Sequence, residues 1–229
     1  MPIKTCIFDA YGTLFDVAAA ARNASKEPEY PELAETWPQL AEHWRLKQLQ
    51  YTWLRAVTGD HTDFWTVTQN GLDWALDKTG LAGNQALRDR LLQLYWELQA
   101  YPEVLDTLTK LKAVNQNTAI LSNGSVDMLN GAVTSAEIGH VLDDVLSVDS
   151  VGIFKPSAKV YDLVQARFGG TREDILFVSS NGWDAAAAAG YGFTTAWVNR
   201  AQDPVDRLSA RPQHILSDLT GIADLVSAS

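Results

Sequence analysis

The stretch "FDAYGTLF", residues 8–15, ends a short apolar run with one carboxylate and follows it with a turn. The residues from Cys6 to Phe8 are of the types found in buried strands, and Gly12 with Thr13 marks the turn. Asp9 therefore stands at the tip of a predicted strand. Aspartate is common in turns, so Asp9 alone predicts a turn or cap carboxylate before it predicts a functional one.

The composition describes an ordinary globular chain. Its 229 residues are 46% apolar and 20% charged, which is enough for one large domain or for one domain with a second inserted into it. The net charge of −10 argues against nucleic acid or an anionic membrane as a partner, because both are bound through Lys and Arg. An anionic small-molecule substrate would need a local cluster of positive groups.

Neither secretion nor membrane insertion is predicted. Cys6 is the one cysteine, so no intrachain disulfide can form. The N-terminal sequence lacks a charged and then apolar signal segment, and no run of about 18 apolar residues is present. We expect a cytoplasmic protein.

From residue 101 onward, strand and helix patterns alternate. Predicted strands cover 117–124, 143–149, 174–183, 194–199 and a short segment after 214, and predicted helices lie between them. Alternation of this kind predicts an α/β fold with a doubly wound, mostly parallel sheet that helices cover on both faces. The run "AAAAA" at 185–189 is most simply a small-residue helix face packed close to that sheet.

Residues 15–100 interrupt the alternation with helical patterns rich in Trp, Leu and Gln. This segment is too long for a crossover between two strands, so we interpret it as an inserted helical cap. The predicted catalytic core then comprises residues 1–14 and 101–229, and the cap comprises residues 15–100.

Polar residues gather where the predicted strands end. Ligands of open α/β sheets bind at the carboxyl ends of the strands, which places four stretches on one rim: "DAYGT", "SNGS", the "FKP" turn and "SSNGWD". Lys155 is expected near a helix N-terminus, where a cation is unfavourable unless a carboxylate lies nearby. The rim candidates are Asp9, Thr13, Ser122, Asn123, Lys155, Ser179, Asn181 and Asp184.

The order of these motifs resembles the haloacid dehalogenase superfamily, which has a Rossmann-like core. Within it, Tyr11, the cap sequence "HWRLKQLQYTWLR" (43–55) and "LFVSSNGWD" (176–184) resemble the L-2-haloacid dehalogenases. Phosphatases of the superfamily carry a second acid at the position of Tyr11 and another acid at the position of Ser180. Those acids protonate the leaving group or hold magnesium, so their absence predicts an enzyme without a metal or other cofactor.

A halide leaves without being protonated, so an aromatic ring can stand beside Asp9 where a phosphatase has its second acid. A site from which water is excluded also favours attack by the Asp9 carboxylate. The resemblance implies that Asp9 displaces halide from C2 of a short L-2-haloacid, forming an ester and inverting C2. Water then attacks the ester carbonyl and releases a D-2-hydroxyacid. Asp184 is the candidate to activate or orient that water, and Lys155, Ser179 and Asn181 hold the two carboxylates.

The cap is expected to supply the halide site. A helix over residues 40–57 would carry two apolar stripes on roughly opposite sides, so we expect other parts of the protein or a second subunit to cover it on both sides. The first stripe comprises Leu40, Trp44, Tyr51 and Leu54, and the second comprises Leu46, Leu49, Trp53 and Val57. Together with family precedent, this suggests a homodimer. Considered without the resemblance, Arg45 is best interpreted as a surface arginine whose aliphatic stem covers apolar groups. The resemblance makes it the halide-binding cation, with Asn123 and Trp183.

The remaining assignments concern substrate contacts. Ser122, Lys155 and backbone amides near Tyr11 and Asn123 are expected to hold the substrate carboxylate. The predicted lining of the alkyl pocket is Leu46, Leu49, Phe64 and Trp183.

Three other functions stay open at this point. The same ester chemistry suits another small electrophile, such as fluoroacetate or a strained ring. A magnesium-dependent phosphatase is disfavoured by Tyr11 and Ser180. A non-catalytic binding module is disfavoured because it has no need for Asp9, Arg45, Lys155 and Asp184 together.

Overall fold

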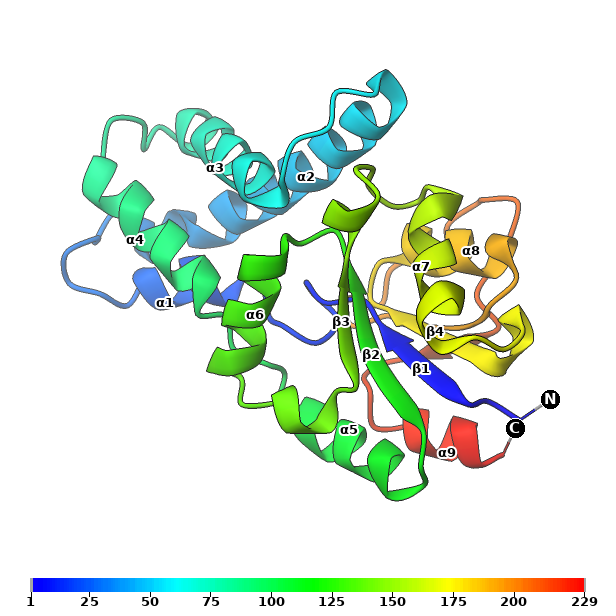
Figure 1. Ribbon diagram of the computed structural model, residues 1–229. Coiled ribbons are helices and arrows are strands. Elements are labelled where there is room, and N and C mark those ends of the chain that lie inside the picture. The colour runs from blue at the N-terminus through cyan, green and yellow to red at the C-terminus, as the bar shows by residue number, and fades with distance from the viewer. Residues whose placement is uncertain (1, 229) are drawn as a thin grey trace.

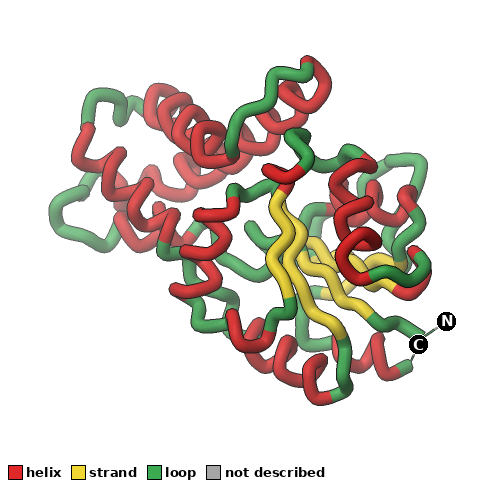
Figure 2. The backbone as a smooth tube through the Cα atoms, in the orientation of Figure 1, coloured by secondary structure: helices red, strands yellow, loops and turns green. Residues whose placement is uncertain are grey.

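The computed structural model describes residues 2–228 and contains one parallel sheet with the order β3-β2-β1-β4-β5-β6. Figures 1 and 2 show this sheet with helices on both sides. The strands are β1 (Thr5–Phe8), β2 (Asn117–Ser122), β3 (Asp144–Ser147), β4 (Ile175–Ser179), β5 (Thr194–Val198) and β6 (His214–Leu216). The predicted α/β doubly wound class is confirmed.

β1 occupies the middle of the sheet, since its side chains are buried on both faces and all but Thr5 are apolar. Its last residue, Phe8, is in register with Ile120 of β2 and Val178 of β4. The carboxyl ends of these three strands therefore meet at one edge. Asp9, Ser122 and Ser179 follow or end the three strands, so the topology alone brings them together.

The helices of the sheet layer alternate with the strands. α5 packs against β2 and α9, while α7 packs against α8, which contacts β4 and β5. Short 3₁₀ helices span Gly139–Val141, Val148–Ser150 and Arg172–Asp174. The longer helices are α5 (Val104–Ala113), α6 (Val126–Ser135), α7 (Ala158–Phe168), α8 (Gly182–Tyr191) and α9 (Ile222–Ser227).

Four helices stand between β1 and α5 in the chain and form a separate layer, which we call the four-helix segment. Figure 1 shows its α2 and α3 on the side of the sheet where the strands' carboxyl ends lie. The helices are α1 (Ala19–Ala24), α2 (Leu33–Thr58), α3 (Phe64–Thr79) and α4 (Gln85–Trp96). Buried Trp44 of α2 donates from Nε1 to the carbonyl of Thr68 in α3 at 2.8 Å, which fixes the pairing of the two longest helices.

The two apolar stripes of α2 differ in how they are covered. Leu40 and Trp44 are buried, as expected, but Leu54 on the same predicted stripe is 53% exposed. On the second stripe Leu46 is 53% exposed and Val57 is 86% exposed. Within this chain, therefore, α2 is covered on one side along its first half and is open on the other side toward its C-terminal end.

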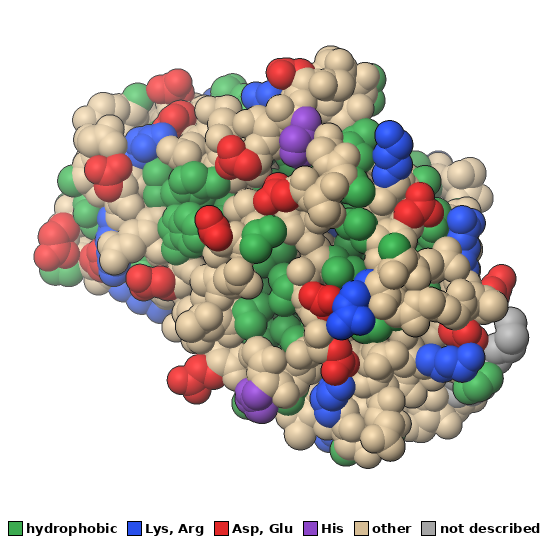
Figure 3. All heavy atoms as spheres, in the orientation of Figure 1, with side chains coloured by type: hydrophobic (Ala, Val, Ile, Leu, Met, Phe, Trp, Pro, Cys, Tyr) green, Lys and Arg blue, Asp and Glu red, His purple; other side chains and the backbone are tan. Residues whose placement is uncertain are grey.

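The surface matches the acidic composition. On the face drawn in Figure 3, acidic and basic side chains are scattered among neutral ones, and the basic side chains do not gather into a patch. Between residues 2 and 228, none of the helices combines the length and the apolar character needed to cross a membrane.

The small-residue face of α8 lies against the sheet, with Ala185 and Ala188 fully buried. Replacing Ala188 by Leu inserts three extra carbons into this contact, and we expect a loss of about 1–3 kcal/mol of unfolding free energy. Ala34, exposed on α2, is the control, since the same change there leaves stability nearly unaltered. The measurement is the urea midpoint of both variants. Equal midpoints would contradict the close packing of α8.

Candidate active site

Asp9 lies at the carboxyl end of β1, and three donors hold its side chain. Its backbone amide still belongs to the sheet, donating to the carbonyl of Val178 at 2.9 Å. Oδ2 accepts hydrogen bonds from Thr13 Oγ1 and Asn181 Nδ2, both at 3.0 Å. Oδ1 accepts one from Lys155 Nζ, also at 3.0 Å. A carboxylate has about four acceptor sites, so one remains, and it is on Oδ1.

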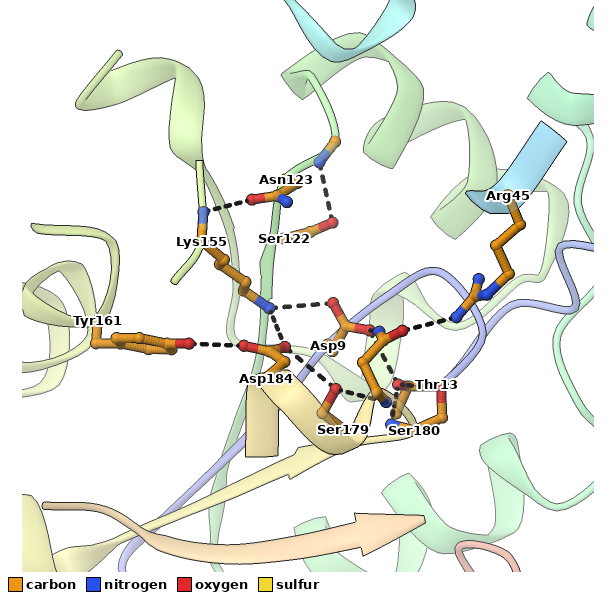
Figure 4. Close-up of polar contacts among 12 residues, drawn as sticks. Asp9, Thr13, Arg45, Ser122, Asn123, Lys155, Tyr161, Ser179, Ser180 and Asp184 are labelled. Carbon is orange, nitrogen blue, oxygen red and sulfur yellow. Dashed lines mark hydrogen bonds and ion pairs between the residues drawn. The ribbon is translucent and has the colours of Figure 1, made fainter. Parts of the chain in front are cut away.

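The ammonium of Lys155 lies between two carboxylates (Figure 4). It donates to Asp9 Oδ1 at 3.0 Å and to Asp184 Oδ2 at 2.9 Å, and its side chain is 1% exposed. Burial alone would lower the pKa of Lys155. The charges of Asp184 and Asp9, with their hydrogen bonds, outweigh burial and raise this pKa. Lys155 therefore remains charged and holds both acids in place.

Asp184 is fully buried at the start of α8. Besides Lys155, it accepts hydrogen bonds from Ser179 Oγ at 3.1 Å and from the Tyr161 hydroxyl at 2.8 Å. Burial raises the pKa of Asp184, and the nearby charge of Asp9 raises it further, while Lys155 opposes both effects. Two carboxylates share one ammonium, which makes Asp184 a stronger proton acceptor than an exposed aspartate.

Thr13 ties the loop after β1 to the loop after β4. Its Oγ1 accepts from the backbone amide of Ser180 at 2.7 Å and donates to Asp9. Ser179 Oγ likewise accepts from the backbone amide of Asn181 at 3.1 Å. Ser179 thus uses a backbone amide of its own loop to aim its hydroxyl at Asp184, and Thr13 uses an amide of the other loop to aim its hydroxyl at Asp9.

Arg45 reaches the site from α2 and is joined to Asp9 through one residue. Its guanidinium donates to Asn181 Oδ1 at 2.8 Å, and the amide nitrogen of Asn181 donates to Asp9. Gly12 makes room for this approach. A Cβ on Gly12 would lie 2.7 Å from an Arg45 nitrogen, and the φ of +90° also favours glycine.

Most of the predicted site residues border one small inner cavity of about 30 Å³. Its size is far below the 300–1,000 Å³ typical of pockets for drug-sized ligands, so it suits a substrate of very few atoms. The residues that line it are Asp9, Tyr11, Arg45, Gln48, Leu49, Phe64, Tyr95, Ser122, Asn123, Lys155, Asn181 and Trp183. Thr13, Ser179 and Asp184 are buried behind this lining.

Beside the inner cavity lies a larger outer cavity of about 650 Å³. Four residues line both cavities: Arg45, Leu49, Asn181 and Trp183. These side chains separate the two spaces.

On the strand side of the inner cavity, Ser122 and Asn123 are fixed by the backbone. Ser122 Oγ accepts from the Gly124 amide at 3.0 Å, which leaves the hydroxyl proton available to a ligand. Asn123 Oδ1 accepts from the Lys155 amide at 2.9 Å, so its amide nitrogen is also available.

Leu46 is the predicted pocket residue that the structure does not place in the cavity. It is 53% exposed and absent from the lining. Successive helical residues differ by about 100°, so Arg45 and Leu49 share a side of α2 while Leu46 turns away from it.

Four residues that contribute to the site were not predicted from the sequence as site residues: Gly12, Gln48, Tyr95 and Tyr161. Gln48 had a usable signal, because it is a polar residue four positions after Trp44 on the buried side of α2. Tyr95 and Tyr161 come from helices distant in the sequence, and no local pattern marks them.

The donor set does not fit a divalent cation. Such ions need oxygen ligands, and here the ammonium of Lys155 occupies the space between the two carboxylates. The ring of Tyr11 and the hydroxyl of Ser180 stand where acids would add to a metal site. In residues 2–228, no group of three or more His, Cys, Asp or Glu side chains is arranged to hold a metal ion.

Comparisons with known proteins agree with this arrangement. Residues 3–192 match the family model of the haloacid dehalogenase-like hydrolases. The chain is 40% identical to (S)-2-haloacid dehalogenase 1 of Pseudomonas sp. (strain CBS-3), over 98% of this chain and 97% of that protein. It is 38% identical to (S)-2-haloacid dehalogenase 4A of Burkholderia cepacia, over 98% and 95% of the two chains.

The fold agrees as closely. The L-2-haloacid dehalogenase of Xanthobacter autotrophicus, solved with chloropropionic acid covalently bound, superposes with a TM-score of 0.86 at 34% identity, covering 98% of each chain. The sequence match, the fold and the arrangement around Asp9 lead to one conclusion: this chain belongs to the haloacid dehalogenase-like hydrolases, alongside the (S)-2-haloacid dehalogenases.

Proposed function

We propose that the chain hydrolyses short L-2-haloacids to D-2-hydroxyacids through an ester on Asp9. The observation that carries this proposal is that Asp9 and Arg45 line the same small cavity and are joined through Asn181. A nucleophile and a cation for the leaving anion thus face one space. The covalent chloropropionic acid adduct of the Xanthobacter relative supports the same chemistry.

In the first step, Asp9 Oδ1 attacks C2 in line with the carbon–halogen bond. A bond forms between Oδ1 and C2, the halogen leaves with the bonding electrons, and C2 inverts. The cavity residues proposed to receive the halide are Arg45, Asn123 and Trp183. A guanidinium already held by Asn181 needs no rearrangement when this charge develops.

The substrate carboxylate is assigned to Ser122 and Lys155, away from Arg45 and Trp183. Ser122 has a free hydroxyl proton, and Lys155 uses two of its three N–H groups on the acids, which leaves one for the substrate. Backbone amides near Tyr11 and Asn123 complete this proposed site. These groups supply positive potential locally in a chain whose net charge is −10.

In the second step, water attacks Cγ of Asp9. Charge then develops on Oδ2, where Thr13 and Asn181 already donate. Asp184 accepts or orients the water proton, the bond from Cγ to Oδ1 breaks, and Oδ1 leaves as the product hydroxyl oxygen. Asp9 is restored with an oxygen from water, and one proton is released overall.

The rival functions fit these residues less well. A magnesium-dependent phosphatase is disfavoured by Tyr11 and Ser180, which stand in place of the further carboxylates that such an enzyme would carry. A non-catalytic module gives no reason to bury two acids and an ammonium beside a cavity. Fluoroacetate or a strained ring would use the same nucleophile, and a substrate screen separates these from 2-haloacids.

A test of the proposed function is chloride release from L- and D-2-chloropropionate in the presence of a chelator. We expect release from the L isomer only, a D-lactate product, and no effect of chelation. In ¹⁸O water, a single turnover leaves the label in Asp9 because Oδ1 departs with the product. Label in the first product, or activity on the D isomer alone, would rule out the proposal.

The role of Asp184 has its own prediction. Asp184→Asn removes the proton acceptor but keeps side-chain size, so we expect a first burst of halide close to one per site and then a rate at least about 100-fold lower. The measurement is rapid-quench halide release with mass analysis of the esterified protein. Asp9→Asn is the matched control and gives no burst. Sustained turnover in Asp184→Asn would assign the water to another group.

We also propose that residues 15–100 act as the cap and that α2 joins two copies of the chain into a homodimer. This rests on exposed apolar side chains of α2: Leu46 and Val57 on one predicted stripe are 53% and 86% exposed, and Leu54 on the other stripe is 53% exposed. Exposed apolar side chains gathered along one helix are typical of a protein interface.

For the dimer we predict that Val57→Glu shifts the protein toward monomers at micromolar concentration, because a charge in an apolar interface lacks a partner. Sedimentation velocity measures the shift. Leu105→Glu, which changes a residue that is 45% exposed on α5, is the control and leaves the mass unchanged. A monomeric unsubstituted protein, or equal masses for all three proteins, would contradict the interface.

A further inference from the structure

Two tyrosines in the inner cavity have hydroxyl groups that the mechanism above leaves without a role. Tyr11 comes from the loop after β1 and Tyr95 from α4, and their rings stack with centroids 5.7 Å apart and planes 18° apart. Both residues line the cavity, and they are 8% and 3% exposed. Trp44 also contacts the Tyr95 ring, with centroids 4.9 Å apart, which helps to fix that ring.

The hydrogen bonds of Tyr95 leave its proton free. Gln48 Nε2 donates to the Tyr95 hydroxyl oxygen at 3.0 Å and to Thr68 Oγ1 at 2.9 Å. The phenol oxygen is thus an acceptor here, and its own O–H has no acceptor among the hydrogen bonds of residues 2–228. The Tyr11 hydroxyl is buried and has no hydrogen-bond partner within the same residues.

Both phenols remain protonated near neutral pH. Burial is the largest influence in each case: it raises the pKa of Tyr95 to about 12 and raises the pKa of Tyr11 well above the usual value. Each therefore offers an O–H donor. A buried donor without an acceptor is costly, so a ligand that accepts from it gains affinity.

The direction of attack indicates which part of the substrate they face. In-line displacement places the halogen on the side of C2 opposite Asp9, away from the strands. Arg45, Gln48 and Tyr95 all come from the four-helix segment, and the charge of Arg45 acts on Tyr95. The carboxylate donors Ser122 and Lys155 belong to the sheet side.

We propose that Tyr95, oriented by Gln48 and stacked on Tyr11, donates a hydrogen bond to the departing halide. This inference rests on the proposed function and deepens it, because it adds the O–H donor of Tyr95 to the proposed halide site. A phenol donor favours halides with concentrated charge, so it assists fluoride and chloride more than bromide or iodide. Gln48 is a positioning residue, since it acts through Tyr95.

The test compares Tyr95→Phe with the unsubstituted enzyme on L-2-chloropropionate and L-2-bromopropionate in single turnovers. Phe keeps the ring and the stacking and removes only the hydroxyl. We expect halide release to slow on the order of tenfold for chloride, which corresponds to about 1.4 kcal/mol, and clearly less for bromide. The hydrolysis rate of the ester, measured afterwards, stays the same.

Tyr191→Phe is the matched control. The Tyr191 hydroxyl contacts Asp162 on α7, away from the cavity, and its loss leaves the ratio of chloride to bromide rates unchanged. Gln48→Leu is expected to move that ratio in the same direction as Tyr95→Phe. An equal loss for both substrates in Tyr95→Phe would show a structural role only and would overturn the inference.

A second measurement does not depend on turnover. Chloride binding to the unreacted protein, followed by calorimetry, is expected to weaken on the order of tenfold in Tyr95→Phe, and bromide binding less. If the unsubstituted protein released no halide from haloacids but Tyr95→Phe still weakened chloride binding selectively, the proposed function would be wrong and the role of Tyr95 as a halide donor would be supported. Normal turnover with unchanged halide binding in Tyr95→Phe would overturn the donor alone.

Discussion

The buried ammonium of Lys155 is the interaction on which the site depends. It lies within 3.0 Å of both Asp9 and Asp184, in a region with almost no solvent exposure. Two carboxylates this close in an apolar interior would repel each other and take up a proton. In the proposed mechanism, Lys155 keeps Asp9 available as a nucleophile and Asp184 available as a base.

A second link joins the two layers of the molecule. Asn181 accepts from Arg45 with its oxygen and donates to Asp9 with its nitrogen, so one amide connects the four-helix segment to the nucleophile. Gly12 permits the contact because any side chain there would strike the guanidinium. The position of the proposed halide cation is thereby tied to that of the proposed attacking oxygen. In-line displacement requires this relation between the two ends of one carbon–halogen bond.

The sequence predicted the sheet and most of the cavity because both follow from local pattern. Apolar runs that end in polar turns mark parallel strands, and their carboxyl ends converge on Asp9, Ser122 and Ser179. Tyr95 could not be found this way, since its place depends on how α4 packs against α1 and α3 and on the contact of its ring with Trp44 of α2. Leu46 was expected to line the pocket, but one position along a helix turns a side chain about 100° from Arg45. Tertiary packing decides contacts of this kind.

The sizes and the shared border of the two cavities bear on how a substrate reaches Asp9. At about 30 Å³ it sits beside an outer cavity of about 650 Å³, and Arg45, Leu49, Asn181 and Trp183 border both. An anion that passed from the outer cavity to the inner one would meet Arg45, which borders both, before Asp9, which borders only the inner one, so the proposed halide cation would also guide the substrate inward. In the proposed mechanism, the small inner cavity and the guanidinium on its border therefore act together to favour a small anionic substrate.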